Sequence, residues 1–386
     1  MSGSQLGFYE FFAGGGLARL GLGKSWDCLF ANDFSEKKAA AYRQNFSPAD
    51  ELHVGDVRKL TAADLPGHAT LAWASFPCQD LSLAGERKGL RGERSGTFWT
   101  FWELMEGLSD AARRVPIVVL ENVVGALTSH GGRDFAGIVE RIAESGYRVG
   151  ALVMDASLWV PQSRPRLFIV AVDRAIEVPE ECVAAEPEPL WHTAAVRKAF
   201  EGIGDVAREA WAWWRLPKPP ARKQRLMDVI EDDPTSVEWH SKEQTQRLID
   251  LMSPLHREKL QEVQREGEPA VGTIYRRTRP DADGSKVQRA EIRFDQVSGC
   301  LRTPAGGSSR QTIMIVQGGD VRSRLLSSRE AARLMGVKDS YKLPESYNDA
   351  YHLMGDAVAV PVVGWLREHL LEPLAQHVFT PAKNHA

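Results

Sequence analysis

The chain has 386 residues, of which 43% are hydrophobic and 26% are charged, and its formal net charge is −3. This composition is that of a folded globular protein, and it excludes a mainly disordered chain and one that is basic throughout. The first residues lack a basic region followed by an apolar core, and the apolar run at 115–120 is too short to span a bilayer. We expect a cytoplasmic protein with one large and one smaller domain.

The first half of the chain alternates short apolar runs with amphipathic stretches. This alternation predicts buried strands separated by helices, in a mostly parallel, doubly wound α/β sheet. An acidic segment with three prolines at 173–190 predicts a domain boundary. Residues 191–301 are rich in tryptophan and charge, and no regular pattern is readable there. The predicted strands are 6–12, 28–31, 71–76, 115–120 and 167–172.

Two helices are predicted near the end of the chain. Ser327 and Glu330 have the spacing of a capping box, which predicts a helix that begins at Ser327 and stops at Gly336. Pro361 suits the first turn of a last helix, from 362 to about 371.

A glycine turn, Gly14-Gly15-Gly16, follows the first predicted strand and precedes a predicted helix. This arrangement lets a ligand approach the backbone, although the GxGxxG spacing of dinucleotide dehydrogenases is absent. Asp33-Phe34 and Asp56-Val57 follow the second and the presumed third strands. An acid there can accept both ribose hydroxyls, Phe34 offers a flat face to adenine, and Asp56 can accept from the adenine amino group. We therefore expect a cofactor that contains adenosine.

The four cysteines show no CxxC pairing and no histidine at metal-ligand spacing, so neither a disulfide framework nor a metal site is predicted. Cys78, in Phe76-Pro77-Cys78-Gln79, stands where an apolar run ends, and Pro77 fixes the backbone before it. Reactive groups in doubly wound sheets lie at the carboxyl ends of strands, which makes Cys78 the candidate nucleophile. The alternative is a small buried hydrophobic side chain. The cysteines are Cys28, Cys78, Cys182 and Cys300.

Charged residues at two further strand ends extend this candidate site. Glu121 closes the run at 115–120, so its carboxyl lies at the same sheet edge as Cys78. Arg164 and Arg166 begin another strand, where alternation points both in one direction, and one of them could anchor a phosphate or a base carbonyl. A helix cap for Glu121 and a surface pair for the arginines are the structural alternatives.

One segment of the chain is basic. Residues 271–329 carry eleven Lys and Arg against five Asp and Glu. Such an excess can face nucleic-acid phosphate or simply form a solvated surface.

Taken in order, these motifs resemble those of the DNA cytosine C5-methyltransferases, over nearly the whole chain outside 191–301. The resemblance implies a Rossmann-like, S-adenosylmethionine-dependent methyltransferase sheet at 1–175. It also implies a smaller, irregular target recognition domain at 176–340, and a segment at 341–386 that returns to the catalytic domain. The motifs are the glycine turn, the two acids, Pro77-Cys78-Gln79, Glu121-Asn122-Val123, Gln162-x-Arg164-x-Arg166, 324–336 and Gly355-Asp356-Ala357-Val358.

The resemblance also implies a mechanism. The Cys78 thiolate adds to C6 of a cytosine flipped out of duplex DNA, which activates C5 toward the methyl group. Glu121 acts at N3, and Arg164 with the local backbone favours the thiolate. Arg166 and Gln79 complete the catalytic set, with Gln79 helping to fill the gap that the flipped base leaves.

The binding residues follow from the same resemblance. Two departures from the family pattern are Glu10, where Asp is usual, and Asp356, where Asn is usual. Contacts to S-adenosylmethionine are implied for Phe12, Ala13, Gly14, Gly16, Leu17, Asp33, Phe34, Asp56, Val57, Pro77, Phe98, Asp356 and Ala357. Contacts to DNA are implied for Ser82, Arg87, Lys88, Arg91, Arg94 and Arg302.

We expect a monomer that acts on double-stranded DNA without a metal or a membrane, as a prokaryotic or phage restriction-modification or orphan enzyme. A tRNA cytosine-5 methyltransferase and a catalytically inactive DNA-binding paralogue are the alternatives. The large recognition insert favours DNA over tRNA, and the presence of Cys78, Glu121 and Arg164 argues against an inactive paralogue.

Overall fold

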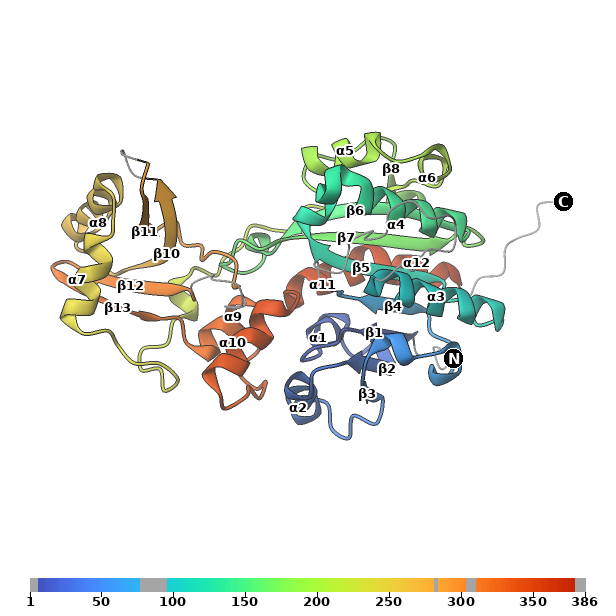
Figure 1. Ribbon diagram of the computed structural model, residues 1–386, viewed down its shortest axis with the longest axis horizontal. Coiled ribbons are helices and arrows are strands. Elements are labelled where there is room, and N and C mark those ends of the chain that lie inside the picture. Colours follow the sequence, from blue (N-terminus) through green and yellow to red (C-terminus); the bar gives the residue numbers. More distant parts are fainter. Residues whose placement is uncertain (1–5, 77–95, 281–283, 303–309, 379–386) are drawn as a thin grey trace. The chain divides into compact units, whose positions relative to one another are not determined.

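The computed structural model describes residues 6–76, 96–280, 284–302 and 310–378 (Figure 1). The chain divides into two compact units. The first unit comprises 1–155, 165–219 and 360–386, and the second comprises 156–164 and 220–359. The chain therefore crosses between the units four times.

The main sheet of the first unit has seven strands in the order β3-β2-β1-β4-β5-β7-β6. Neighbours from β3 to β5 pair in parallel, whereas β7 runs antiparallel to β5 and β6, which confirms the mostly parallel α/β sheet. The order reverses at β1, and sheets of this type bind ligands outside the carboxyl ends of strands at such a point. The strands are β1 Leu6–Phe11, β2 Trp26–Asp33, β3 Leu52–Val54, β4 Leu71–Ala74, β5 Ile117–Val123, β6 Tyr147–Asp155 and β7 Pro165–Asp173.

The helices of the first unit follow the predicted alternation. The last predicted helix is confirmed, with Pro361 in its first turn, and a π-helical turn at Arg367–Leu371 extends it into α12. α11 packs on α1 so closely that a Cβ atom on Gly21 would lie 2.4 Å from the Cβ atom of Val363. The helices are α1 Leu17–Leu22, α2 Glu36–Asn45, α3 Thr97–Asp110, α4 Arg133–Glu144, α5 Ala194–Glu201, α6 Asp205–Glu209, α11 Val360–Leu366 and α12 Glu372–Val378.

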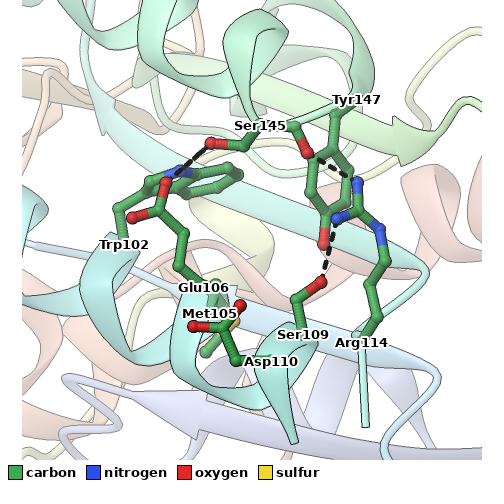
Figure 2. A pocket seen from close by; sticks show the side chains of 8 residues that line it. All are labelled: Trp102, Met105, Glu106, Ser109, Asp110, Arg114, Ser145 and Tyr147. Carbon is green, nitrogen blue, oxygen red and sulfur yellow. Dashed lines mark hydrogen bonds between the residues drawn. The ribbon is translucent and has the colours of Figure 1, made fainter. Parts of the chain in front are cut away.

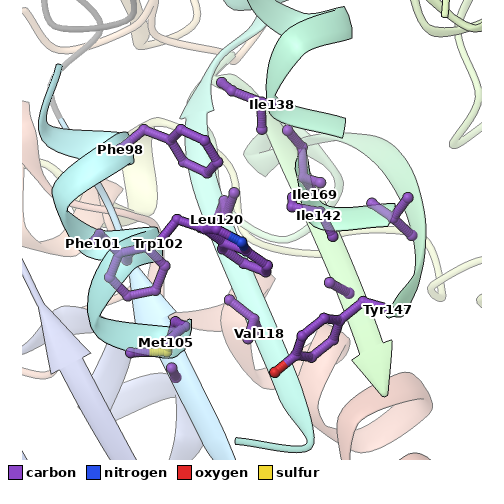
Figure 3. Close-up of a cluster of buried hydrophobic side chains, with 14 of the residues drawn as sticks. Phe98, Phe101, Trp102, Met105, Val118, Leu120, Ile138, Ile142, Tyr147 and Ile169 are labelled. Atoms are coloured by element: carbon purple, nitrogen blue, oxygen red, sulfur yellow. The ribbon is translucent and has the colours of Figure 1, made fainter. Parts of the chain in front are cut away.

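A large apolar core joins α3 and α4 to the sheet (Figure 3). Trp102 of α3 and Ile142 of α4 are buried with Val118 and Leu120 of β5. Burial of each such side chain stabilises the fold by roughly 1.5–3 kcal/mol. This core fixes the position of β5, which carries Glu121 at its carboxyl end.

Residues 180–216 cover the outer edge of β6. The N–H of Val149 donates to the Ala210 carbonyl (2.9 Å), and the Val149 carbonyl accepts from Ala212 N–H (2.8 Å). Farther along, Val153 N–H donates to the Trp191 carbonyl (2.8 Å). An exposed edge strand invites pairing with other chains, so this cover protects the sheet. The segment contains α5, α6 and a short ribbon of β8 Val183–Ala184 and β9 Trp213–Trp214.

The second unit is built around a four-stranded antiparallel sheet in the order β11-β10-β12-β13. α7 and α8 supply Leu248 and Leu260 to a small core with Ile274, Ile292 and Met314 of the sheet. The elements are α7 Lys242–Asp250, α8 Pro254–Glu266, β10 Ala270–Pro280, β11 Lys286–Arg293, β12 Thr312–Gln317, β13 Asp320–Leu325, α9 Ser328–Leu334 and α10 Tyr347–Asp356.

The predicted capping box at the start of α9 is confirmed. Ser327 Oγ accepts from Glu330 N–H (3.0 Å), and the Glu330 carboxylate accepts from Ser327 N–H (2.7 Å). The same carboxylate forms a fully buried ion pair with Arg324 (2.6 Å). None of the helices in the described ranges is both long and apolar enough to cross a membrane.

The cover on β6 leads to a first prediction, because Gly150 of β6 lies directly beneath it. A Cβ atom there would lie 1.9 Å from the Ala212 carbonyl oxygen and 2.7 Å from Trp214 Nε1. We expect Gly150→Ala to lower the free energy of unfolding by about 1–3 kcal/mol, the usual cost of overpacking. Chemical denaturation measures the change. Gly125→Ala is the control, since its nearest neighbour would be 3.9 Å away, and equal losses in both variants would contradict the packing account.

Candidate active site

Most of the predicted site residues of the first unit come from the ends of four adjacent strands or from the loops that follow them. β1 ends at Phe11, β2 at Asp33, β4 at Ala74 and β5 at Val123. Because these strands are parallel neighbours, their carboxyl ends meet at one edge of the sheet. The fold therefore brings the glycine turn, Asp33 and Glu121 to the same edge.

The glycine turn is held by the acid that ends β2. Gly14 N–H donates to Asp33 Oδ2 (2.8 Å), and Asp33 Oδ1 accepts from Ser35 N–H (2.8 Å). Gly14 and Gly16 have φ values of 56° and 75°, in the left-handed region that favours glycine. A Cβ atom on Gly14 would meet nothing within 4 Å, whereas one on Gly16 would lie 2.3 Å from the Phe46 ring. The turn is thus open on one side and tightly packed on the other.

Two more predicted cofactor residues have properties that suit a ligand. Phe34 is 73% exposed, which is unusual for a phenylalanine side chain. Asp56 caps the 3-10 turn Val57–Lys59, and hydrogen bonds from the Arg58 guanidinium lower the pKa of its carboxyl to about 2. An ionised acceptor and an exposed ring therefore follow β2 and β3.

Other predicted cofactor residues have different surroundings. Phe12 adopts a φ of 58° and is half-buried, whereas Ala13, Leu17 and Val57 are buried. Phe98 is also buried, and its ring packs against Phe76 with centroids 6.0 Å apart. Asp356 is exposed and Ala357 is half-buried at the end of α10, in the second unit. Their contacts with the cofactor stay predictions.

The end of β5 places two polar side chains on opposite faces of the sheet. Glu121 is buried, and its Oε1 lies 3.3 Å from Arg166 Nε. The pair forms because Glu121 and Val123 share a face and Val123 is paired with Arg166. Asn122 donates from Nδ2 to the Phe76 carbonyl (3.0 Å) and accepts at Oδ1 from Val123 N–H (2.8 Å). Sequence reasoning assigned no role to this asparagine, which anchors the residue just before Pro77-Cys78.

Arg164 differs from its expected position. The sequence predicted that Arg164 and Arg166 lie on one strand and point in the same direction. β7 begins at Pro165, so Arg164 precedes the strand and the prediction does not hold for it. Its buried guanidinium donates to backbone carbonyl groups of the second unit, whereas Arg166 pairs with Glu121 of the first. The two arginines have separate partners because the chain leaves the first unit at 156 and returns at 165.

Several predicted residues lie outside the described part of the chain. Among the described cysteines, burial raises the pKa of Cys28 to about 12 and that of Cys182 to about 11. Both thiols are therefore protonated near neutral pH and unsuited to nucleophilic attack. Arg302 is described and exposed. The residues outside the described ranges are Pro77, Cys78, Gln79, Ser82, Arg87, Lys88, Arg91 and Arg94.

Comparison with known proteins decides the family. The model of the C-5 cytosine-specific DNA methylase family matches residues 6–372. The chain belongs to this family. Its activity is accordingly that of a DNA cytosine-5 methyltransferase, and its sheet is the Rossmann-like sheet of such enzymes.

The methylase is similar to bacterial proteins along most of its length. It is 26% identical to the Type II methyltransferase M.BsuFI of Bacillus subtilis, over 96% of this chain and 74% of that protein. It is 25% identical to M.NlaX of Neisseria lactamica, over 95% of this chain and 96% of that protein.

Solved structures show the same fold at lower identity. S. pombe Dnmt2 methyltransferase matches with a TM-score of 0.58 and 18% identity, over 96% of this chain and 99% of that one. The Entamoeba histolytica methyltransferase EhMeth matches with a TM-score of 0.59 and 12% identity, over 98% of this chain and 100% of that one.

A pocket of about 320 Å³ in the methylase lies away from this edge (Figure 2). Residues at the end of α3 and the start of β6 line it, at the amino ends of the parallel strands. Arg114 donates to Ser109 Oγ (3.2 Å) and to the Ser145 carbonyl (2.8 Å), and Ser145 Oγ donates to Glu106 (2.8 Å). These polar groups bind one another, so the pocket adds nothing to the candidate site. Within the described ranges, no group of His, Cys, Asp and Glu could hold a metal ion.

Glu10 of the methylase, the residue that departs from the family pattern, is buried in β1. It is 1% exposed, and its Oε1 accepts from Arg19 N–H (3.3 Å). Within the described structure its Oε2 has no hydrogen-bond partner. The Arg19 side chain binds Tyr42 Oη (2.6 Å) and Glu51 instead of Glu10. Burial therefore raises the pKa of Glu10 to about 8.

This shift predicts a pH dependence of stability. The pKa of Glu10 is near 4.5 in the unfolded chain and is raised in the folded protein. The contribution of the protonated carboxyl to stability is therefore complete only below pH 4.5. That stability is lost as the pH rises through about 8. At pH 9 we expect the free energy of unfolding of Glu10→Gln to exceed that of the wild type by a few kcal/mol, because the difference is proportional to the pKa shift. Near pH 4.5 the two free energies should be equal. Unfolding at a series of pH values measures the difference, and a constant difference across the series would contradict the prediction.

Proposed function

We propose that the methylase modifies C5 of a cytosine flipped out of duplex DNA, through a covalent bond between Cys78 Sγ and cytosine C6. The hydrogen bond from Asn122 to the Phe76 carbonyl is the observation that carries this proposal. It joins the chain leading into Cys78 to the strand that carries Glu121. A nucleophile and a carboxyl group then arise from two adjacent strand ends, as a reaction at a pyrimidine ring requires.

The residues of the chain account for the chemistry at the base. Addition of the Cys78 thiolate to C6 makes C5 nucleophilic. Glu121, held by Arg166, stabilises or protonates N3 as negative charge develops on the ring. Loss of the C5 proton and cleavage of the C6–S bond later restore the aromatic base. These atoms are inaccessible in a stacked duplex, so the base must leave the helix at a cost of a few kcal/mol.

S-adenosylmethionine fits the residues around the glycine turn, and when bound it supplies an electrophilic methyl group. The open side of Gly14 permits close approach to the backbone. Asp33 and Asp56 offer acceptors for ribose hydroxyls and the adenine amino group, and the exposed Phe34 ring offers a stacking surface. Asp33 already accepts two backbone N–H groups, so its orientation is fixed in advance.

A recognition role is proposed for residues 220–340 of the second unit, the part that falls within the predicted interval 176–340. The β10–β11 hairpin places Arg277 and Arg279 on one face, with Arg289 directly opposite Arg277. Glu291 lies on the same face and contacts Arg277 (3.5 Å) and Arg279 (2.6 Å). This arginine face lies opposite the face that α7 and α8 cover. Exposed guanidinium groups gathered on one face suit contacts with phosphate.

The biological role that we propose is sequence-specific modification, either beside a restriction enzyme or as a solitary activity. The bacterial relatives named above carry Type II methyltransferase names. Methylation of tRNA by the same thiol chemistry is the competing substrate assignment. The match to the family of C-5 cytosine-specific DNA methylases supports DNA.

The covalent step is tested with Cys78→Ser. We expect at least a thousandfold loss of methyl transfer to DNA, roughly the cost of removing a nucleophile, with S-adenosylhomocysteine binding unchanged. In the presence of S-adenosylmethionine, duplex DNA containing 5-fluorocytosine should form a denaturation-resistant adduct with the wild type and none with the variant. After methyl transfer, fluorine at C5 blocks the proton loss that releases Cys78. Cys300→Ser is the matched control. An adduct with Cys78→Ser, or labelling of tRNA in place of DNA, would overturn the proposal.

The arginine face is tested by the salt dependence of binding. We expect Arg277→Ala and Arg279→Ala each to reduce the slope of log K against log salt concentration by about 1. The methylation pattern in sequenced DNA should stay the same, because phosphate contacts carry no sequence information. Arg265→Ala, on the exposed side of α8, is the control and should leave the slope unchanged. Unchanged slopes in the two hairpin variants would exclude this face from the DNA contact.

A further inference from the structure

The segment that leads into Asp56 is fixed to strand β2. β3 pairs with β2 in parallel, and the pairing ends at Val54 beside Asp33 (Figure 1). Beyond this point Gly55 N–H donates to the Asp33 carbonyl (3.0 Å), and Asn32 Nδ2 donates to the Gly55 carbonyl (2.9 Å). Asn32 is 1% exposed, so water competes little for its hydrogen bonds. The backbone positions of Asp33 and Asp56 are therefore fixed relative to each other.

The Asp56 side chain is held by Arg58. Asp56 Oδ1 accepts from the backbone N–H of Arg58 (3.0 Å), as the cap of the turn Val57–Lys59. Arg58 Nε donates to Oδ1 (3.0 Å) and to Oδ2 (2.9 Å), and Arg58 Nη2 donates to Oδ2. Backbone and side-chain donors of one residue thus hold both carboxylate oxygens. A guanidinium that binds in this way restricts the carboxylate to one orientation.

This ion pair is too exposed to contribute much to stability. The side chains of Arg58 and Asp56 are 66% and 33% exposed. Water screens the attraction between charges at such a surface, and ordering the two side chains costs conformational entropy. The orientation of the Asp56 carboxylate is therefore the main consequence of the pair.

The Asp56 carboxylate can still accept a hydrogen bond from a ligand. An ionised carboxylate accepts about four hydrogen bonds, and Arg58 donates from its backbone N–H, Nε and Nη2. Hydrogen bonds from Arg58 lower the pKa of Asp56 to about 2, so the carboxyl is ionised and only accepts. The amino group of adenine is a donor, whereas a 6-oxo group at the same place on the purine is an acceptor. An oriented carboxylate therefore distinguishes the two groups.

We propose that Arg58 is a positioning residue that directs the Asp56 carboxylate at the amino group of adenine, and so makes the cofactor site selective for a 6-aminopurine. The proposal rests on the proposed function, in which Asp56 accepts from that amino group. Arg58 acts through Asp56 and needs no contact with the cofactor. Without the guanidinium, the Asp56 side chain keeps its charge but can adopt other rotamers, and a ligand must then order it at an entropic cost.

The selectivity is measured by calorimetric titration of the full-length protein with S-adenosylhomocysteine and with S-inosylhomocysteine, its 6-oxo analogue. We expect the wild type to bind the adenosyl compound more tightly by a factor on the order of 10 to 100, typical of a hydrogen bond to a charged group. In Arg58→Ala this selectivity factor should fall by about 3- to 10-fold, the cost of immobilising one side chain. Binding of S-inosylhomocysteine should not weaken, because this compound has no amino group to bind Asp56.

Steady-state kinetics separate positioning from damage to the fold. In Arg58→Ala the KM for S-adenosylmethionine should rise by about the same 3- to 10-fold. The kcat should stay unchanged, because adenine binding contributes equally to the ground state and the transition state. The unfolding temperature should change little, since the ion pair is exposed.

Two further variants establish the route by which Arg58 acts. In Asp56→Ala the two compounds should bind with similar affinity, and adding Arg58→Ala to this variant should change neither affinity further. Arg43→Ala is the matched control, because Arg43 is also an exposed arginine of the first unit that pairs with an acid, Glu36 (3.4 Å). The control should keep the wild-type selectivity factor.

An unchanged selectivity factor in Arg58→Ala, or tighter binding of S-adenosylhomocysteine by that variant, would overturn the proposal. An equal effect of Arg58→Ala with and without the Asp56 carboxylate would also overturn it, as would equal affinity of the wild type for the two compounds. Failure of the proposed function is recognised separately, because the wild type would then bind neither compound and form no adduct with 5-fluorocytosine DNA.

Discussion

Parallel pairing of β1 with β2 and β4, and of β4 with β5, is the constraint on which the candidate site depends. Parallel strands end at the same edge, so strand pairing alone brings residues that are far apart in the sequence to that edge. The apolar core beneath α3 and α4 keeps these strands in register. Polar contacts then adjust the strand ends by small amounts, as Asp33 does for Gly14 and Asn122 does for Phe76.

Arginine side chains serve three different purposes in the methylase, and their surroundings distinguish them. Arg164 and Arg324 are buried and bind carbonyl or carboxylate oxygens within the second unit, and these contacts stabilise its fold. Arg166 holds a buried carboxylate at the edge of the sheet. Arg277 and Arg279 lie exposed on one face of the β10–β11 hairpin, where both contact Glu291. An exposed guanidinium is the kind suited to bind an external anion.

Much of the sheet of the first unit was predictable, because buried strands read as apolar runs. One helix of the second unit was predictable too, because a capping box has a fixed spacing. The predicted strands and the helix after Ser327 are observed for this reason. Strand β6 was not predicted, although it lies next to β7. The position of Arg164 was not predictable either, since alternation assumes an uninterrupted strand and the chain changes units one residue later. Pairing of Glu121 with Arg166 depends on the register of β5 with β7, which no local pattern encodes.

The contact between α1 and α11 has a consequence for synthesis of the chain. Gly21 meets Val363 across more than three hundred intervening residues, and both belong to the first unit. During translation the strands of the first unit are synthesised long before α11, so the side of α1 that packs on α11 has no partner until the whole second unit has been made. Closure of the first unit is therefore a late, long-range event that follows synthesis of the second unit. A ribosome that stopped at residue 359 would release the complete second unit and a first unit without its last helices.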